Sequence, residues 1–442
     1  MLDNENKLYI HNDYVILSKE ISYPSKIIIT GEHSVLYGSK VLSIAINNYV
    51  LSGELLLINN FNKNNNIFEV ISNIDNNENN NVFNLSIQDI IKEESNLLWL
   101  DYNKYAKSNN VDLLIIKERL KDKLQNIIKD FVSQTTNEIN NKEQFKLIIS
   151  FLFNYLIEEN YLYNFNDIKS LLYSFLKNNK NNNNSCFVLH INSSIPVGAG
   201  LGSSAAYTLA IVKSILISFK NIVNNNNSSL NLSKLLLKLE CETFKDNLEK
   251  ALAFIGETYL HSKTNGTDII SIYYKKCILF NSYYDIEVVD SNFFKNFNKH
   301  IEIFLINTNV HRSAYNVLTN ISKTIVDNES NIKEMKIVSE KIIEVFNILG
   351  NNKLNYNDCS NYLNMFLKSI KINQELLKQR GASTSIINNI INVLDCEYIS
   401  CKITGAGGGG FLLSFVLREY IEYFKNICYK NNIDYIQTIT SF

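Results

Sequence analysis

The stretch Ile195-Pro-Val-Gly-Ala-Gly-Leu-Gly-Ser-Ser-Ala-Ala206 decides the fold that we expect for this chain. The apolar segment 186–191 precedes it and is typical of a buried β-strand. Apolar residues recur at helical spacing over 203–218, so the stretch also opens a helix. A glycine loop between a strand and a helix N-terminus presents unpaired N–H groups to an anion such as phosphate. The stretch therefore predicts a phosphate-binding loop, and a structural turn capped by Ser203 is the alternative.

Two familiar phosphate-loop patterns do not fit this stretch. A Walker A loop needs a Lys after its last glycine, and no Lys follows Gly202. A dinucleotide fingerprint needs a third glycine where Ser203 stands. We expect the loop to bind the phosphates of a nucleotide triphosphate, with the Ser204 hydroxyl available to a phosphate-bound Mg²⁺. The predicted phosphate-binding residues are Pro196, Gly198, Ala199, Gly200, Leu201, Gly202, Ser203 and Ser204.

Glycine is concentrated in three windows of a chain that otherwise avoids it. The sequence has 15 Gly in 442 residues, against about 7% in an average protein. The window Lys402-Ile-Thr-Gly-Ala-Gly-Gly-Gly-Gly-Phe411 lies between apolar segments, where a flexible linker would be polar. We expect its backbone to fold closely around a ligand or another loop. The candidate residues of this third glycine loop are Gly405, Ala406, Gly407 and Gly408.

The remaining window, Gly31-Glu-His-Ser-Val-Leu-Tyr-Gly38, follows an apolar run that begins at Lys26. A Lys at the start of such a run more often extends its amine to solvent than takes part in catalysis. Both interpretations of Lys26 stay open on the residues alone. Glu32 and His33, taken by themselves, are polar loop residues.

Composition excludes some function classes. The formal net charge is −1 and the pI is about 6.6, so nothing favours binding to nucleic acid or an anionic membrane. The N-terminal residues do not have the pattern of a signal peptide, and we find no uncharged apolar stretch of about 18 residues. The seven cysteines are scattered without a C-x-x-C pattern, which favours reduced thiols in a cytoplasmic protein.

Strand-like and helix-like segments mix along the chain, which predicts an α+β or α/β architecture in two lobes with a boundary near residue 297. Asparagine-rich runs near 59–81, 178–184 and 224–227 are expected to be surface insertions. The predicted strands are 26–30, 41–50, 186–191, 302–307, 399–404 and 411–416, and helices are predicted in 203–218 and 232–261.

The three windows, in this order, resemble the motifs of the GHMP small-molecule kinases. The resemblance implies an α+β, two-lobed fold, with an ATP-binding lobe carrying the glycine-rich phosphate loop over 1–297. A C-terminal α+β lobe would occupy 298–442. The wording of the motifs is most similar to that of members that phosphorylate mevalonate.

The resemblance also assigns roles to individual residues. Such members have a magnesium-binding Glu on a helix and, eleven residues later, an Asp that acts as base, and Glu257 and Asp268 have this spacing. Mg²⁺ would then be held by Ser204 and Glu257. Asp268 would accept the proton of the substrate hydroxyl, and Lys26 would contact Asp268 and favour its ionised form.

Three further residues are implied to bind the substrate: Glu32, His33 and Arg312. Two segments depart from the family pattern. The family usually has Ala-Pro-Gly-Lys where this chain has Tyr-Pro-Ser-Lys, residues 23–26, and the loop before Asp268 lacks the family's Pro and Ser. The second departure bears on which substrate the chain accepts.

The expected activity is the ATP- and Mg²⁺-dependent phosphorylation of the 5-hydroxyl of mevalonate, which gives 5-phosphomevalonate and ADP. The resemblance further implies a cytoplasmic homodimer in isoprenoid and sterol biosynthesis. One alternative is another kinase of this family, such as a phosphomevalonate kinase. The other is a catalytically inactive relative that senses a ligand, although such a protein would be expected to lose Lys26, Glu257 or Asp268.

Overall fold

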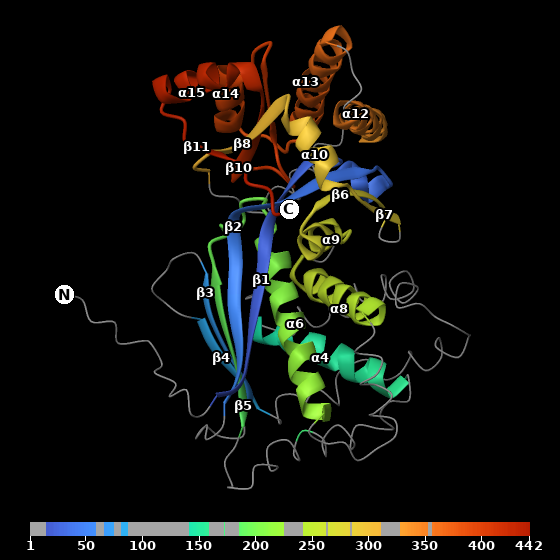
Figure 1. Ribbon diagram of the computed structural model, residues 1–442, viewed down its shortest axis with the longest axis vertical. Coiled ribbons are helices and arrows are strands. Elements are labelled where there is room, and N and C mark those ends of the chain that lie inside the picture. The colour runs from blue at the N-terminus through green and yellow to red at the C-terminus, as the bar shows by residue number, and fades with distance from the viewer. Residues whose placement is uncertain are drawn as a thin grey trace, which may run out of the picture. The chain divides into compact units, whose positions relative to one another are not determined.

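The computed structural model describes most of the chain and divides it into two compact units (Figure 1). Unit 1 comprises residues 1–22, 52–192 and 207–264, and unit 2 comprises residues 23–51, 193–206 and 265–442. The described residues are 15–58, 66–74, 81–86, 141–158, 172, 185–224, 242–261, 264–282, 285–310, 328–351 and 356–442.

Unit 1 contains a sheet in the order β4-β3-β5-β2, with β1 also paired to β2. Its strands are the first half of β1 (Val15–Thr30), the last part of β2 (Val41–Ile58), β3 (Asn66–Ile74), β4 (Asn81–Ser86) and β5 (Cys186–Ser193). Three helices, α4 (Asn141–Glu158), α6 (Ser203–Asn224) and α8 (Glu242–His261), lie on one face of this sheet (Figure 1). Phe68 joins sheet and helix, because its ring lies 5.1 Å from Phe145 of α4 and 5.5 Å from Phe187 of β5.

Unit 2 contains the first half of β2, which pairs antiparallel with β6, and β6 pairs in turn with β7. It also contains a four-stranded antiparallel sheet in the order β11-β8-β10-β9. Its strands are β6 (Cys277–Ser282), β7 (Asp285–Val288), β8 (Ile301–Asn307), β9 (Ile399–Ile403), β10 (Phe411–Leu417) and β11 (Tyr435–Gln437). The helices are α9 (Thr267–Tyr274), α10 (Ser291–Asn298), α12 (Asn328–Gly350), α13 (Tyr356–Gln379), α14 (Ser385–Leu394) and α15 (Ile421–Lys430), with short 3₁₀ turns at Ser34–Tyr37 and Arg418–Tyr420.

The core of unit 2 explains why β8, β9 and β10 form at all. Their inward residues are apolar and fully buried, and they pack with the apolar faces of α13, α14 and α15. The last residues of the chain fasten to this unit as well, since Asn47 donates its backbone N–H to Ile439 and Ser441 donates its own to Ala45.

The strands predicted from the sequence are all present, although β1 and β2 extend well beyond the predicted bounds. Helix α6 begins at Ser203 as expected, and α8 fills the part of 232–261 that the structure describes. The predicted boundary near residue 297 stays a prediction. The two compact units are divided elsewhere, and unit 2 includes residues 23–51 and 193–206. Within the predicted insertion 59–81, residues 66–74 form β3 of the sheet rather than a surface insertion. The remaining asparagine-rich residues lie almost entirely outside the described residues.

Two further observations concern composition. In the described part of the chain, α6 alone is long and apolar enough to cross a membrane, but 78% of its most apolar window is buried, as in the core helix of a globular protein. The described cysteines are all free thiols, namely Cys186, Cys277, Cys359, Cys396, Cys401 and Cys428.

Candidate active site

The glycine-rich loop of residues 193–206 contacts the side chain of Lys26 at Gly202. Every glycine in the three windows has a positive φ, which fits the conformational need expected from the sequence. At Gly202 the close approach of neighbouring side chains is a second reason why glycine is needed. A Cβ there would lie 2.8 Å from Ile272 Cδ1 and 3.0 Å from Lys26 Cγ. Only glycine lets the loop turn into α6 at this distance from the lysine.

The second and third glycine windows pack backbone to backbone. Phe411 donates its N–H to the carbonyl of Ala199 at 3.3 Å. A Cβ on Gly410 would lie 2.5 Å from the same carbonyl oxygen, and one on Gly405 would lie 3.4 Å from the Gly200 oxygen. The third window therefore packs closely against another loop, which is one of the two partners expected for it.

Lys26 and Asp268 form an ion pair. Lys26 Nζ lies 2.8 Å from Asp268 Oδ1, and the lysine side chain is 2% exposed whereas the aspartate side chain is 37% exposed. The predicted contact is confirmed, and the interpretation that Lys26 extends to solvent is wrong. The backbone N–H of Lys26 donates to the carbonyl of Leu201 in the glycine loop at 2.9 Å.

The local structure around Asp268 explains how it reaches Lys26. Asp268 stands in the first turn of α9. Gly266, in the left-handed conformation at φ 83°, precedes the helix, and Asn265 Oδ1 accepts the N–H of Thr267 at 2.9 Å. The carboxylate is thus held at a helix N-terminus, where backbone dipoles favour negative charge.

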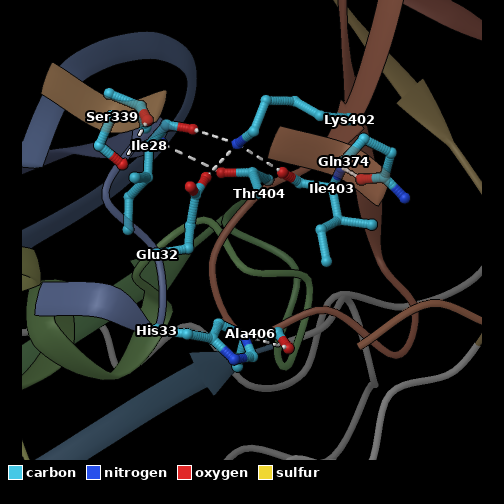
Figure 2. Close-up of polar contacts among 10 residues, drawn as sticks. Ile28, Glu32, His33, Ser339, Gln374, Lys402, Ile403, Thr404 and Ala406 are labelled. Atoms are coloured by element: carbon cyan, nitrogen blue, oxygen red, sulfur yellow. Dashed lines mark hydrogen bonds and ion pairs between the residues drawn. The ribbon is translucent and has the colours of Figure 1, made fainter. Parts of the chain in front are cut away.

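Glu32 is buried and does not face solvent, and its predicted role in substrate binding stays a prediction. Its side chain is 1% exposed and forms an ion pair with Lys402, which is itself completely buried (Figure 2). The prediction missed this because the two residues are 370 positions apart. The structure makes Glu32 the buried partner of Lys402.

Lys402 has three acceptors within unit 2. Besides Glu32 Oε1, its Nζ donates to the carbonyls of Ile403 at 2.9 Å and Ile28 at 3.4 Å (Figure 2). Burial lowers the pKa of Lys402 below its ordinary value, Glu32 opposes this effect, and the positive charge of Lys26 adds to it. The lysine charges beside the first and third windows therefore interact.

His33 joins the first and third windows at a second point. Its Nε2 lies 3.1 Å from the carbonyl oxygen of Ala406 (Figure 2), and its backbone has φ 59° and ψ −45°, which non-glycine residues rarely adopt. A role for His33 in substrate binding stays a prediction. Arg312, the third residue predicted to bind substrate, lies outside the described residues.

The predicted magnesium ligand Glu257 is a buried carboxylate on α8 in unit 1. Thr208 of α6 donates its hydroxyl to Glu257 Oε1 at 3.1 Å, and Gln144 of α4 donates to Thr208 Oγ1 at 2.7 Å. His261 Nε2 lies 3.7 Å from Glu257 Oε2. The described residues contain no group of three acidic, histidine or cysteine side chains suited to a metal. One carboxylate fits Mg²⁺ that takes its other ligands from phosphates and water.

Ser204 stands in the first turn of α6 within unit 2, and its predicted pairing with Glu257 around Mg²⁺ stays a prediction. Two residues of these networks were not predicted as site residues. Lys402 has the same signal that drew attention to Lys26, a lysine in an apolar run beside a glycine window. Thr208 has no signal in the sequence, because its contact with Glu257 joins two separate helices.

Known proteins resemble the chain in sequence and in fold. Residues 166–276 match the GHMP kinases N terminal domain. The mevalonate kinase of Schizosaccharomyces pombe is 28% identical over 249 residues, which cover 56% of this chain and 47% of that enzyme. The match thus spans about half of the length of this curated relative.

Two solved structures share the fold at low identity. The Methanococcus jannaschii mevalonate kinase has a TM-score of 0.54 at 19% identity and covers 96% of this chain and 98% of its own. The Streptococcus pneumoniae phosphomevalonate kinase, in complex with phosphomevalonate and AMPPNP, has a TM-score of 0.55 at 12% identity, with coverages of 95% and 99%. Residues 166–276 are thus similar to the GHMP kinases N terminal domain, and the chain shares the α+β fold of these solved mevalonate and phosphomevalonate kinases.

Proposed function

We propose that the protein transfers the γ-phosphoryl group of ATP to the 5-hydroxyl of mevalonate and so produces 5-phosphomevalonate and ADP. The observation that carries the proposal is the Lys26–Asp268 ion pair, 2.8 Å long, directly beside the glycine loop. A carboxylate that is partly exposed, paired with a buried cation and adjacent to a phosphate loop suits a base for a hydroxyl nucleophile.

In the proposed step, Asp268 accepts the proton as the substrate oxygen forms its bond to the γ-phosphorus. The bond from that phosphorus to the bridging oxygen breaks, and ADP leaves with the electron pair. Lys26 keeps the carboxylate in place and contributes positive charge near the transferred group. Because the transition state of phosphoryl transfer is loose, positioning and charge neutralisation account for most of the rate.

The backbone of residues 196–204 would hold the phosphates. The N–H groups of the first turn of α6 and of the glycine loop would supply several donors at once, and the helix dipole adds a smaller term. Ser204 and Glu257 would hold Mg²⁺. The ion, when bound, neutralises phosphate charge in the transition state.

Mevalonate is proposed as the substrate on the wording of the motifs and on the curated yeast relative. A phosphomevalonate kinase remains the second candidate, because one fold neighbour has that activity and the loop before Asp268 departs from the family pattern. An inactive sensor is disfavoured by the retention of Lys26, Glu257 and Asp268. A cytoplasmic homodimer that acts in isoprenoid and sterol biosynthesis is part of the same proposal.

The test measures ADP release from Mg²⁺-ATP with mevalonate, phosphomevalonate, homoserine or galactose as acceptor. We expect turnover with mevalonate alone. The Asp268→Asn variant should bind AMPPNP as the unaltered protein does but lose about 10²- to 10⁴-fold in kcat, the usual contribution of a general base. Turnover with phosphomevalonate alone would show that the protein is a phosphomevalonate kinase instead. Binding of AMPPNP without any turnover would support the alternative of an inactive, ligand-sensing protein.

A further inference from the structure

Lys402 is a charged residue inside the apolar strand β9, and it has no role in the proposed mechanism. Its side chain is completely buried, and its neighbours Cys401 and Ile403 are fully buried as well. A buried ammonium group is costly unless it is paired and hydrogen-bonded. A residue retained at such a cost must make contacts that an apolar side chain cannot make.

The first of these contacts is with the backbone of β1. Lys402 Nζ donates to the carbonyl of Ile28 at 3.4 Å, and Thr404 Oγ1 accepts the N–H of the same residue at 3.0 Å (Figure 2). Two side chains at the end of β9 thus take both polar backbone groups of Ile28. Lys26 stands two residues earlier on this strand and therefore on the same face.

The second contact is with Glu32, just beyond the end of β1. The Lys402–Glu32 ion pair is buried on both sides, and Glu32 Oε2 has no hydrogen-bond partner among the described residues. The carboxylate therefore depends on Lys402 for its charge balance. The carbonyl of Leu201 in the glycine loop accepts the backbone N–H of Lys26. The segment 26–32 is fixed at Lys26, at Ile28 and at Glu32.

We propose that Lys402 is a positioning residue for phosphoryl transfer and that Glu32 is its buried counter-ion. Lys402 holds residues 28–32 so that the Lys26 amine meets Asp268, and Glu32 takes no direct part in binding the substrate. The kinetic part of this inference rests on the proposed function, whereas the structural part does not.

The experiment compares Lys402→Met, Glu32→Leu and the double variant with the unaltered protein. Each single change leaves one buried charge without its partner and should lower the urea midpoint of unfolding. The double variant leaves no unpaired charge, so a large part of the midpoint should return. The exposed pair Lys341–Glu344, 3.0 Å long on α12, supplies a matched control through Lys341→Met and Glu344→Leu.

Turnover separates a positioning role from a purely structural one. In the double variant the midpoint returns but the bond to the Ile28 carbonyl does not, so kcat should stay at least about tenfold low, the equivalent of one hydrogen bond to a charged group. The KM values for ATP and the alcohol should change little. A double variant with both stability and kcat restored would overturn the proposal. A selective rise in the KM for the alcohol in Glu32→Leu would also overturn it.

Hydrogen–deuterium exchange supplies a readout that needs no activity. Amides of residues 26–32 should exchange about tenfold faster in Lys402→Met and in the double variant, and not in the Lys341→Met control. If no alcohol is phosphorylated but this exchange is faster, the proposed function is wrong, and the proposal that Lys402 holds residues 26–32 in place is supported. If the exchange is unchanged, Lys402 does not hold residues 26–32 in place, whatever the activity.

Discussion

At Gly202 the missing side chain is what allows the glycine loop to approach Lys26. We expect Gly202→Ala to destabilise the fold, because its Cβ would meet Ile272 and Lys26 within 3.0 Å at a φ of +83°. The strain of the left-handed backbone costs about 1–2 kcal/mol and the overpacking about 1–3 kcal/mol more. Urea unfolding measures the total, and calorimetric titration with AMPPNP should show weaker binding.

Gly38 is the matched control for that substitution. It has the same φ of +83°, but an added Cβ would meet nothing within 4 Å. Gly38→Ala should therefore show only the cost of the backbone conformation, about 1–2 kcal/mol. Equal destabilisation by the two substitutions would mean that the close approach at Gly202 does not matter.

At the scale of the element, the start of α9 determines where Asp268 points. We expect Asn265→Ala to lower kcat about tenfold, because it removes the acceptor that holds the N–H of Thr267 at 2.9 Å and loosens the turn that carries the base. The affinity for AMPPNP should not change. Steady-state kinetics and calorimetric titration measure the two effects separately.

The same kind of contact at α10 serves as control. Asp290 Oδ1 accepts the N–H of Asn292 at 2.7 Å and caps that helix. Asp290→Ala should cost about 1 kcal/mol of stability and leave kcat as it is. A fall in kcat of the same size in both variants would show that the effect of Asn265→Ala is general loosening.

Asp395 links the end of α14 to β9 and should make unfolding depend on pH. Burial raises its pKa to about 6, against the opposing effects of Lys371 and of the Cys401 N–H, which donates to Asp395 Oδ1 at 2.7 Å. The folded protein therefore holds the proton more tightly than the unfolded chain. This contribution to stability is present at low pH and is lost as pH rises from about 4 to 6.

Asp395→Asn cannot titrate and so removes that dependence. The free energy of unfolding of the variant, minus that of the unaltered protein, should rise by about 1–3 kcal/mol between pH 4 and pH 7. Any fixed cost of the amide cancels in this comparison across pH. Urea titrations at several pH values measure the difference, and a flat profile would mean that Asp395 titrates alike in both states.

Much of the element structure could be predicted from the sequence, because it depends on short-range patterns. The strand before the glycine loop, the start of α6 and the positive φ of the window glycines all follow from local periodicity and backbone sterics. The contact of Lys26 with Asp268 followed from a resemblance. The burial of Glu32 could not be predicted, because its partner comes from β9 and no local pattern indicates which distant lysine it meets.

At the scale of the whole molecule, unit 2 is assembled from three separate parts of the chain, and the last residues close it. Thr438 donates its N–H to the Ile303 carbonyl at 3.0 Å, and Ile439 donates to Asn48 Oδ1 at 2.7 Å. The ring of Phe442 lies 5.5 Å from that of Phe294. The division could not be read from the sequence, because it depends on contacts between segments that are hundreds of residues apart.

Deletion of residues 438–442 should therefore lower the free energy of unfolding by about 3–5 kcal/mol, the sum of several net hydrogen bonds and one aromatic contact. Ser441→Ala is the milder comparison. It keeps the backbone bonds and loses only the hydroxyl contacts with Ala45 and Lys275, so about 1 kcal/mol is expected. A truncated chain as stable as the intact one in urea would show that the tail does not support unit 2.

The Lys402–Glu32 pair has a consequence for how the protein is made. Glu32 leaves the ribosome 370 residues before its partner, an interval of roughly 20–70 s at about 5–20 residues per second. Throughout that time the first glycine window has no third window to pack against. The nascent chain must therefore shield the apolar part of β1 without β9, and unit 2 can be completed only after β9 and the third glycine window have been synthesised.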